Sequence, residues 1–164
     1  MVVSFNLDKT YQFLLIALAF FLPLTVYGAN LIIIIIVTLW LFSGKYKNKI
    51  NKIFQSKLMI SSIIFFSLHV VGMLWTEDSN WGFHIVHKMW YFLLLFPILF
   101  TIVKNEYIRY YITAFLIAIT ITEILSYLVW FEIIPPLLKA TAENPTVFMS
   151  HISYNPILAF AIYL

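Results

Sequence analysis

The 164-residue sequence contains no cysteine and little charge, since Asp, Glu, Lys and Arg make up 10% of it and hydrophobic residues 63%. The absence of cysteine excludes disulfides and cysteine-ligated metal sites. A soluble domain carries roughly 25% charged residues, so the low charge argues against a water-soluble globule. Long apolar runs repeat along the chain, and we therefore predict that the lipid bilayer is the solvent for most of it.

Motifs for common chemistries are also absent. The sequence has no Gly-rich phosphate loop, nucleophile elbow or metal-binding box. His84 and His87 have no third ligand nearby in sequence, so we expect neither a metal nor a cofactor. The lysines gather in one short loop beside apolar runs, which leaves no folded basic surface for nucleic acid.

The apolar runs predict an all-α, polytopic transmembrane helix bundle of about six spans, forming one domain over residues 1–164. The expected spans are Tyr11–Tyr27, Leu31–Phe42, Leu58–Trp75, Met89–Val103, Tyr110–Phe131 and Tyr154–Leu164. The first two are short against the ~20 residues of a perpendicular helix, and they predict a helical hairpin or a partly re-entrant element. Gly28 and Asn30 predict the turn between them.

The last apolar run reaches only about half the length of a membrane-spanning helix at Leu164. We therefore expect the chain to be the N-terminal fragment of a longer protein.

Lysine and arginine predict the orientation. In alternate loops, one side holds Lys9, Lys104, Arg109 and the five lysines between Lys45 and Lys57, whereas the other side holds only Lys88 and Lys139. The rich side is predicted to be cytoplasmic, so that loops 76–88 and 132–152 face outward, to the periplasm if the membrane is a bacterial inner membrane. The Lys45–Lys57 loop is then a solvated cytoplasmic loop, or alternatively a binding site for anionic lipid headgroups.

The stretch between Trp75 and Trp90 combines charge, histidine and tryptophan between two apolar runs. Trp81, His84 and Lys88 recur at i, i+3 and i+7, which places them on one face of a helix. We predict an extramembrane loop followed by a short interfacial helix. His84 and Lys88 are candidates for binding the pyrophosphate of a lipid carrier; the alternative is a solvated helix with a snorkelling lysine.

Glu123 lies near the middle of the fifth predicted span, where an acid costs about 3 kcal/mol. Thr113, Thr120 and Ser126 fall roughly on the same helical face, which we expect to face the bundle interior or a water-filled cavity. Glu123 is then a proton or cation site or a contact to a polar substrate. The structural alternative is a protonated acid that is hydrogen-bonded to a neighbouring helix, for example to His69.

His151 lies at the outer mouth of the last span, close to Asn144 and Asn155. It is a candidate base or phosphate contact, or else a residue at a helix start that faces water. Ser150 or Ser153 is expected to cap that helix.

Two patches carry a family resemblance. Leu74-Trp-Thr-Glu-Asp78 leads through a loop to Lys88-Met-Trp-Tyr-Phe-Leu-Leu-Leu-Phe-Pro97, and Phe148-Met-Ser-His-Ile-Ser-Tyr-Asn155 precedes the last run. This layout resembles the N-terminal half of the O-antigen ligase and O-antigen polymerase family. The family typically shows Trp-Ser/Thr-x-Asp at the end of a span, then a lysine leading into a Leu-rich helix with a proline.

The resemblance implies a membrane glycosyltransferase of lipopolysaccharide biosynthesis that uses no metal. Such an enzyme transfers glycan from undecaprenyl pyrophosphate to lipid A-core if it is a ligase, or to another repeat unit if it is a polymerase. An acceptor hydroxyl attacks the anomeric carbon, which calls for a base and for cations on the leaving phosphates. In the family these groups lie in later spans and a large outer loop, so the resemblance implies that this fragment alone is inactive.

Two other functions stay open. One is a small transporter or channel-type subunit with Glu123 as its ion or proton site. The other is a non-catalytic membrane partner protein.

Overall fold

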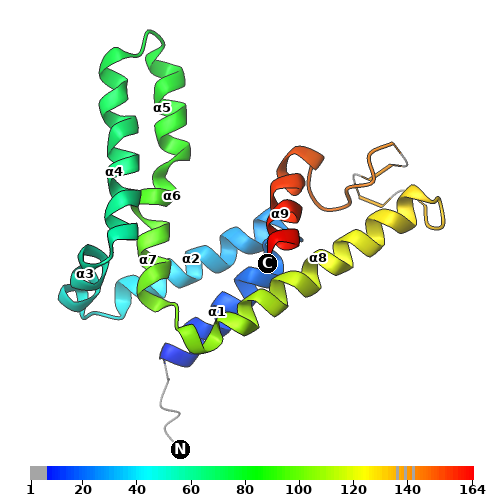
Figure 1. Ribbon diagram of the computed structural model, residues 1–164, viewed down its shortest axis with the longest axis horizontal. Helices are drawn as coiled ribbons and strands as arrows, with labels where there is room; N and C mark the ends of the chain where they lie inside the picture. The colour runs from blue at the N-terminus through cyan, green and yellow to red at the C-terminus, as the bar shows by residue number, and fades with distance from the viewer. Residues whose placement is uncertain (1–6, 136, 139, 142) are drawn as a thin grey trace, which may run out of the picture. The chain divides into compact units, whose positions relative to one another are not determined.

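Figure 1 shows the computed structural model, which describes residues 7–135, 137–138, 140–141 and 143–164. The described residues form helices and contain no strand, so the all-α prediction is confirmed. They divide into two compact units: unit 1 is Met1–Ile36 with Lys104–Leu164, and unit 2 is Val37–Val103.

Unit 1 contains α1 (Leu7–Phe21), the first part of α2 (Val26–Phe42), the 3-10 helix η2 (Asn105–Tyr107), α8 (Ile108–Trp130) and α9 (His151–Tyr163). Unit 2 contains the rest of α2, followed by α3 (Tyr46–Gln55), α4 (Lys57–Gly72), the 3-10 helix η1 (Met73–Trp75), α5 (Ser79–Lys88), α6 (Trp90–Leu93) and α7 (Leu95–Ile102).

Two helical segments in the described part of the chain are long and apolar enough to cross a membrane. They are Lys57–Trp75, with 19 residues, and Asn105–Trp130, with 26 residues. Two bent pairs would raise the number to four if each pair is one span: α2 with α3, bent by 116°, and α5 with the segment Trp90–Ile102, bent by 45°. The third and fifth predicted spans are therefore present as helices of spanning length, but a total of six spans is not confirmed.

The turn between the first two helices lies earlier than Gly28–Asn30, so that prediction is wrong. α1 ends at Phe21 and α2 begins at Val26, with Pro23 in the turn. Pro23 has no N–H to continue a helix and disfavours helical geometry in the residue before it. The Thr25 Oγ1 atom then accepts a hydrogen bond from the Gly28 backbone N–H at 3.3 Å, which caps α2. The expected division into two helices is confirmed.

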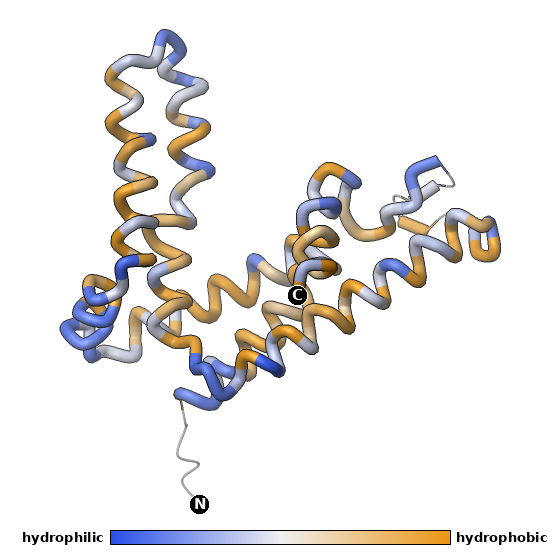
Figure 2. Tube along the Cα trace, viewed as in Figure 1, coloured by the Kyte–Doolittle hydropathy of each residue, from blue (hydrophilic) through white to orange (hydrophobic). Residues whose placement is uncertain are grey.

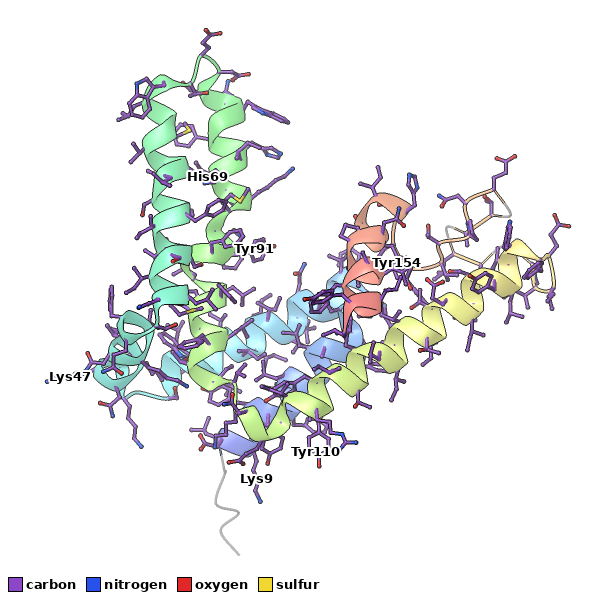
Figure 3. The ribbon with its side chains drawn as sticks, in the orientation of Figure 1. Lys9, Lys47, His69, Tyr91, Tyr110 and Tyr154 are labelled. Carbon is purple, nitrogen blue, oxygen red and sulfur yellow. The ribbon has the colours of Figure 1, made fainter. Side chains whose placement is uncertain are left out.

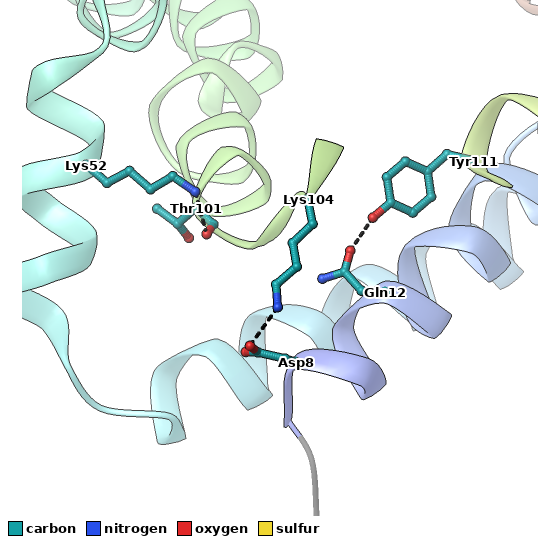
Figure 4. Close-up of polar contacts among 6 residues, drawn as sticks. All are labelled: Asp8, Gln12, Lys52, Thr101, Lys104 and Tyr111. Carbon is teal, nitrogen blue, oxygen red and sulfur yellow. Dashed lines mark hydrogen bonds and ion pairs between the residues drawn. The ribbon is translucent and has the colours of Figure 1, made fainter. Parts of the chain in front are cut away.

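α1 and α8 of unit 1 run parallel, with both helices starting at the same end. The Lys104 ammonium forms an ion pair with the Asp8 carboxylate at 2.7 Å, and further along both helices the Tyr111 hydroxyl donates to Gln12 Oε1 (Figure 4). Apolar residues cover the length of both helices, whereas hydrophilic residues lie mostly at helix ends and in loops (Figure 2). α9 closes this core, because its Tyr154 packs on Phe115 of α8.

Unit 2 is a helical hairpin in which α4 packs against α6 and α7 (Figure 1). At its tip, the Asp78 carboxylate accepts a hydrogen bond from the Trp81 backbone N–H at 3.0 Å and so caps α5. The short helix predicted after Trp75 is therefore present. The fourth predicted span is interrupted, because α6 ends at Leu93 and α7 begins at Leu95; Pro97 is tolerated in the first turn of α7.

Candidate functional site

The candidate site is a pocket of about 210 Å³ in unit 1. It lies between the second half of α8, the loop that precedes α9, and the first turns of α9. Its lining combines an acid, hydroxyls, an amide and two aromatic rings. The lining residues are Glu123, Ser126, Tyr127, Trp130, Pro145, Thr146, Tyr154, Asn155 and Leu158. A water molecule occupies about 30 Å³ in the liquid, so the pocket has room for several waters or for part of a polar ligand.

Helical periodicity and loop packing together build this pocket. Ala118, Thr122, Ser126 and Val129 recur every three to four residues on the buried side of α8, and Glu123 lies half-buried at the edge of that side. Beyond α8, the loop folds back because Val147 packs against Val129. This contact brings the neighbouring loop residues over the end of α8, beside the first turn of α9.

Two hydroxyl groups in the pocket lining are buried without a hydrogen-bond partner among the described residues: Ser126 Oγ and Tyr154 Oη. Their residues are only 9% and 3% exposed. The Glu123 carboxyl and the Tyr154 hydroxyl belong to the same pocket lining, and Figure 3 shows Tyr154 on α9. By contrast, the adjacent Thr122 hydroxyl donates to the Ala118 carbonyl at 2.9 Å.

A buried hydroxyl without a partner costs about 1–3 kcal/mol, and such groups are rare in folded proteins. Two of them beside one carboxyl give the pocket unused hydrogen-bonding capacity, which water or a polar ligand can satisfy.

The prediction that the polar residues of α8 share one inward face is partly wrong. Ser126 is buried beside Glu123 as expected, but Thr113 and Thr120 are exposed. Thirteen residues separate Thr113 from Ser126, and at 3.6 residues per turn they lie on roughly opposite sides of the helix.

The suggested partners of Glu123 in the third span are bonded elsewhere. His69 Nδ1 bonds to the Phe65 carbonyl at 2.9 Å, and the Ser62 hydroxyl donates to the Phe92 carbonyl at 2.7 Å. These polar groups of α4 are thus satisfied within unit 2, whereas Glu123 lines the pocket together with Tyr154 in unit 1.

The remaining candidate residues are exposed and lie outside the pocket. His84 and Lys88 lie on α5 in unit 2, where the His84 ring is 5.4 Å from the Trp81 ring. His151 is the exposed first residue of α9, and Ser150 occupies the N-cap position without a side-chain cap bond.

The structure thus brings together Glu123, Ser126 and Asn155, and it adds Tyr154 and Thr146, which the sequence reasoning missed. Tyr154 left a signal in the sequence, because a hydroxyl in the first turn of an apolar helix requires a partner. Lys139, which entered the orientation count, lies outside the described residues.

No group of three or more metal-ligating side chains comes together within the described parts of the chain. No protein-family model, curated protein or solved structure shows significant similarity to the chain. What the fold defines is a class: an all-helical, strongly apolar protein with two to four helical segments that could cross a membrane.

Proposed function

We propose that this chain is the N-terminal membrane part of an O-antigen ligase-like glycosyltransferase of the bacterial inner membrane. The reaction transfers glycan from undecaprenyl pyrophosphate to lipid A-core. The observation that carries the proposal is the pocket beside Glu123. Its carboxyl, hydroxyl and amide groups suit a ligand rich in hydroxyls, and the rings of Tyr127 and Trp130 offer apolar faces.

The position of the pocket along α8 supports this assignment. Glu123 lies fifteen residues after Ile108, about 22 Å along the helix. The start of α8 carries Lys104 and Arg109, which the distribution of basic residues assigns to the cytoplasm. The pocket then falls in the outer half of the helix, on the side where the glycan acceptor is expected.

The parallel packing of α1 and α8 agrees with the same orientation. Asp8 pairs with Lys104, so the start of α1 and the start of α8 lie together. Lys9 belongs to the group of basic residues that was assigned to the cytoplasmic side. Both helices would then rise from that side toward the outer face.

In the proposed reaction, the acceptor hydroxyl attacks the anomeric carbon of the glycan. The bond from that carbon to the lipid pyrophosphate breaks, the pyrophosphate leaves with the bonding electrons, and a base takes the hydroxyl proton. The pocket would bind glycan hydroxyls through Glu123, Ser126 and Tyr154. His151, which lies in the same unit as the pocket, is proposed as an exposed imidazole group for the phosphates, and no residue of this chain is assigned as the base.

The test uses the native host with the gene intact except for Glu123→Gln or Ser126→Ala. We expect less glycan on lipid A-core and an accumulation of lipid-linked glycan, measured by electrophoresis of lipopolysaccharide and by mass spectrometry of the lipid carrier. The control is Thr113→Ala, on the exposed side of α8. If a deletion of the gene leaves the lipopolysaccharide unchanged, the proposal is wrong. If lipid A-core instead carries single repeat units, the protein is a polymerase.

A second candidate, a transporter or channel-type subunit, draws on the same observation. A carboxyl group beside unpaired hydroxyls within a spanning helix is also suited to a proton or a small cation. Loss of ion-coupled uptake in Glu123→Gln cells whose surface polysaccharide is intact would favour this function over the transferase.

A further inference from the structure

The lysine-rich helix α3 leaves α2 at a sharp angle. The axes of the two helices differ by 116°, and Gly44 and Lys45 make the turn with φ values of 64° and 54°. The stretch from Gly44 to Lys57 contains five lysines and no acid. A polar, lysine-bearing helix that turns away from an apolar one has the geometry of a helix lying along a membrane surface.

Two of the lysines are used to hold α3 within unit 2. The Lys49 ammonium donates to the Trp40 carbonyl at 2.9 Å and to the Ser43 hydroxyl at 2.5 Å, and it lies 4.3 Å from the centre of the Trp40 ring. Burial lowers the pKa of Lys49. The Lys52 ammonium donates to the Thr101 carbonyl at 3.1 Å (Figure 4). These contacts fix the inward face of α3 against the end of α2 and α7.

The other three lysines are Lys47 on the outward face of α3, Lys45 directly before the helix, and Lys57, the first residue of α4. All three are exposed, and none has an ion-pair partner among the residues that the structure describes; Figure 3 shows Lys47 on this face. Ile50 and Phe54 lie one turn apart beside Lys47 and are 45% and 62% exposed. The outward face and the two flanking lysines therefore combine unpaired cations with an exposed apolar pair.

We propose that this outward face of α3 binds the phosphate groups of anionic phospholipids at the membrane surface. Ammonium groups form charge-assisted hydrogen bonds to phosphate oxygens, and the apolar pair would enter the boundary between headgroups and acyl chains. A soluble anion would use the lysines but would leave Ile50 and Phe54 in water. The proposal goes beyond the proposed transferase function and does not depend on it.

The experiment measures lipid retention by the purified chain in detergent. Phosphatidylglycerol and phosphatidylcholine are titrated separately, and native mass spectrometry counts the bound lipids. Each lysine near an anionic surface contributes about a fivefold gain in affinity, so Lys45→Gln, Lys47→Gln and Lys57→Gln together should lower phosphatidylglycerol affinity about a hundredfold. Phosphatidylcholine binding should not change. Circular dichroism checks that the triple variant keeps its helix content.

The matched control is Lys49→Gln, which removes the same charge from the inward face of the same helix. It should lower thermal stability while leaving the preference for phosphatidylglycerol intact. Lys47→Gln should weaken that preference while leaving thermal stability unchanged. If Lys47→Gln and Lys49→Gln reduce lipid affinity equally, net charge rather than this face is responsible and the proposal fails. It also fails if inorganic phosphate displaces the lipid, because the site would then bind soluble anions.

Discussion

Units 1 and 2 differ in how they satisfy polar side chains among apolar helices. In unit 2, the Trp40 indole N–H donates to Thr101 Oγ1 at 2.8 Å, and the hydroxyl of Thr101 donates to the Ile98 carbonyl at 2.7 Å. The buried side-chain atoms without a partner in the described residues all belong to unit 1: Tyr11 Oη, Ser126 Oγ and Tyr154 Oη.

The comparison teaches that a polar residue in an apolar helix is not by itself a functional site. Ser62 and His69 also lie in an apolar helix, but their bonds are made to backbone carbonyls. Ser126 differs because it is buried without a partner beside an acid. Substitutions in both units can test this difference.

The largest effect is expected from Glu123→Gln. Under the proposed transferase function, loss of the carboxyl hydrogen bond to the glycan should reduce transfer about thirtyfold or more. Transfer to lipid A-core is measured in membrane vesicles from the native host. Glu132→Gln, just beyond α8 and outside the pocket lining, is the control and should keep normal activity. Equal rates in wild type and Glu123→Gln would remove Glu123 from the site.

Thr101→Val should produce the largest loss of stability in unit 2, about 1–3 kcal/mol, because the indole N–H of Trp40 loses its acceptor. Unfolding in mixed detergent micelles measures the change. The same substitution at exposed Thr113 should change the free energy of unfolding by no more than about 0.5 kcal/mol. A similar loss at both positions would mean that the bond to Trp40 adds nothing specific.

Tyr154→Phe should, unlike Thr101→Val, leave the stability of the protein nearly unchanged. The hydroxyl has no hydrogen-bond partner among the described residues. Its removal should therefore keep the free energy of unfolding within about 1 kcal/mol of the wild-type value, or raise it. Transfer should nevertheless fall, because the glycan loses a contact. Destabilisation as large as that of Thr101→Val would show that the Tyr154 hydroxyl is paired, and the contrast between the units would disappear.

The smallest effect concerns the pair between Asp8 and Lys104, which is exposed and therefore screened by salt. The hydrogen bond to Asp8 raises the pKa of Lys104 above its ordinary value of 10.5. A raised lysine pKa stabilises the fold below the unfolded value, and this contribution is lost as the pH rises through the folded value. Lys104→Met should thus be slightly less stable than wild type at neutral pH and equally stable in strong alkali. Thermal unfolding at low salt measures both differences.

The helices themselves were largely predictable, because long apolar runs are helical wherever lipid leaves the backbone no other partner. The predicted span Leu58–Trp75 and the helical segment Lys57–Trp75 differ by one residue at the start. The helix ends were harder to predict. The turn at Pro23 is followed by a cap from Thr25, and the break at Leu94 lies where Pro97 has no N–H to donate to the Leu93 carbonyl.

Glu123 was recognisable from the sequence because an acid in an apolar run is energetically unfavourable wherever it lies. Its partners were not recognisable. Tyr154 is thirty-one residues further along the chain, and the loop between them folds back only because Val147 packs on Val129.

The amino-acid sequence was enough to predict the strongly apolar, helical class of the chain and the position of its unfavourable acid. These follow from local composition and periodicity, which do not require knowledge of neighbours. Only the tertiary structure decided which polar groups are satisfied. A hydrogen bond needs two groups within about 3 Å, and whether α8 and α9 leave Ser126 and Tyr154 unpaired depends on contacts between distant segments.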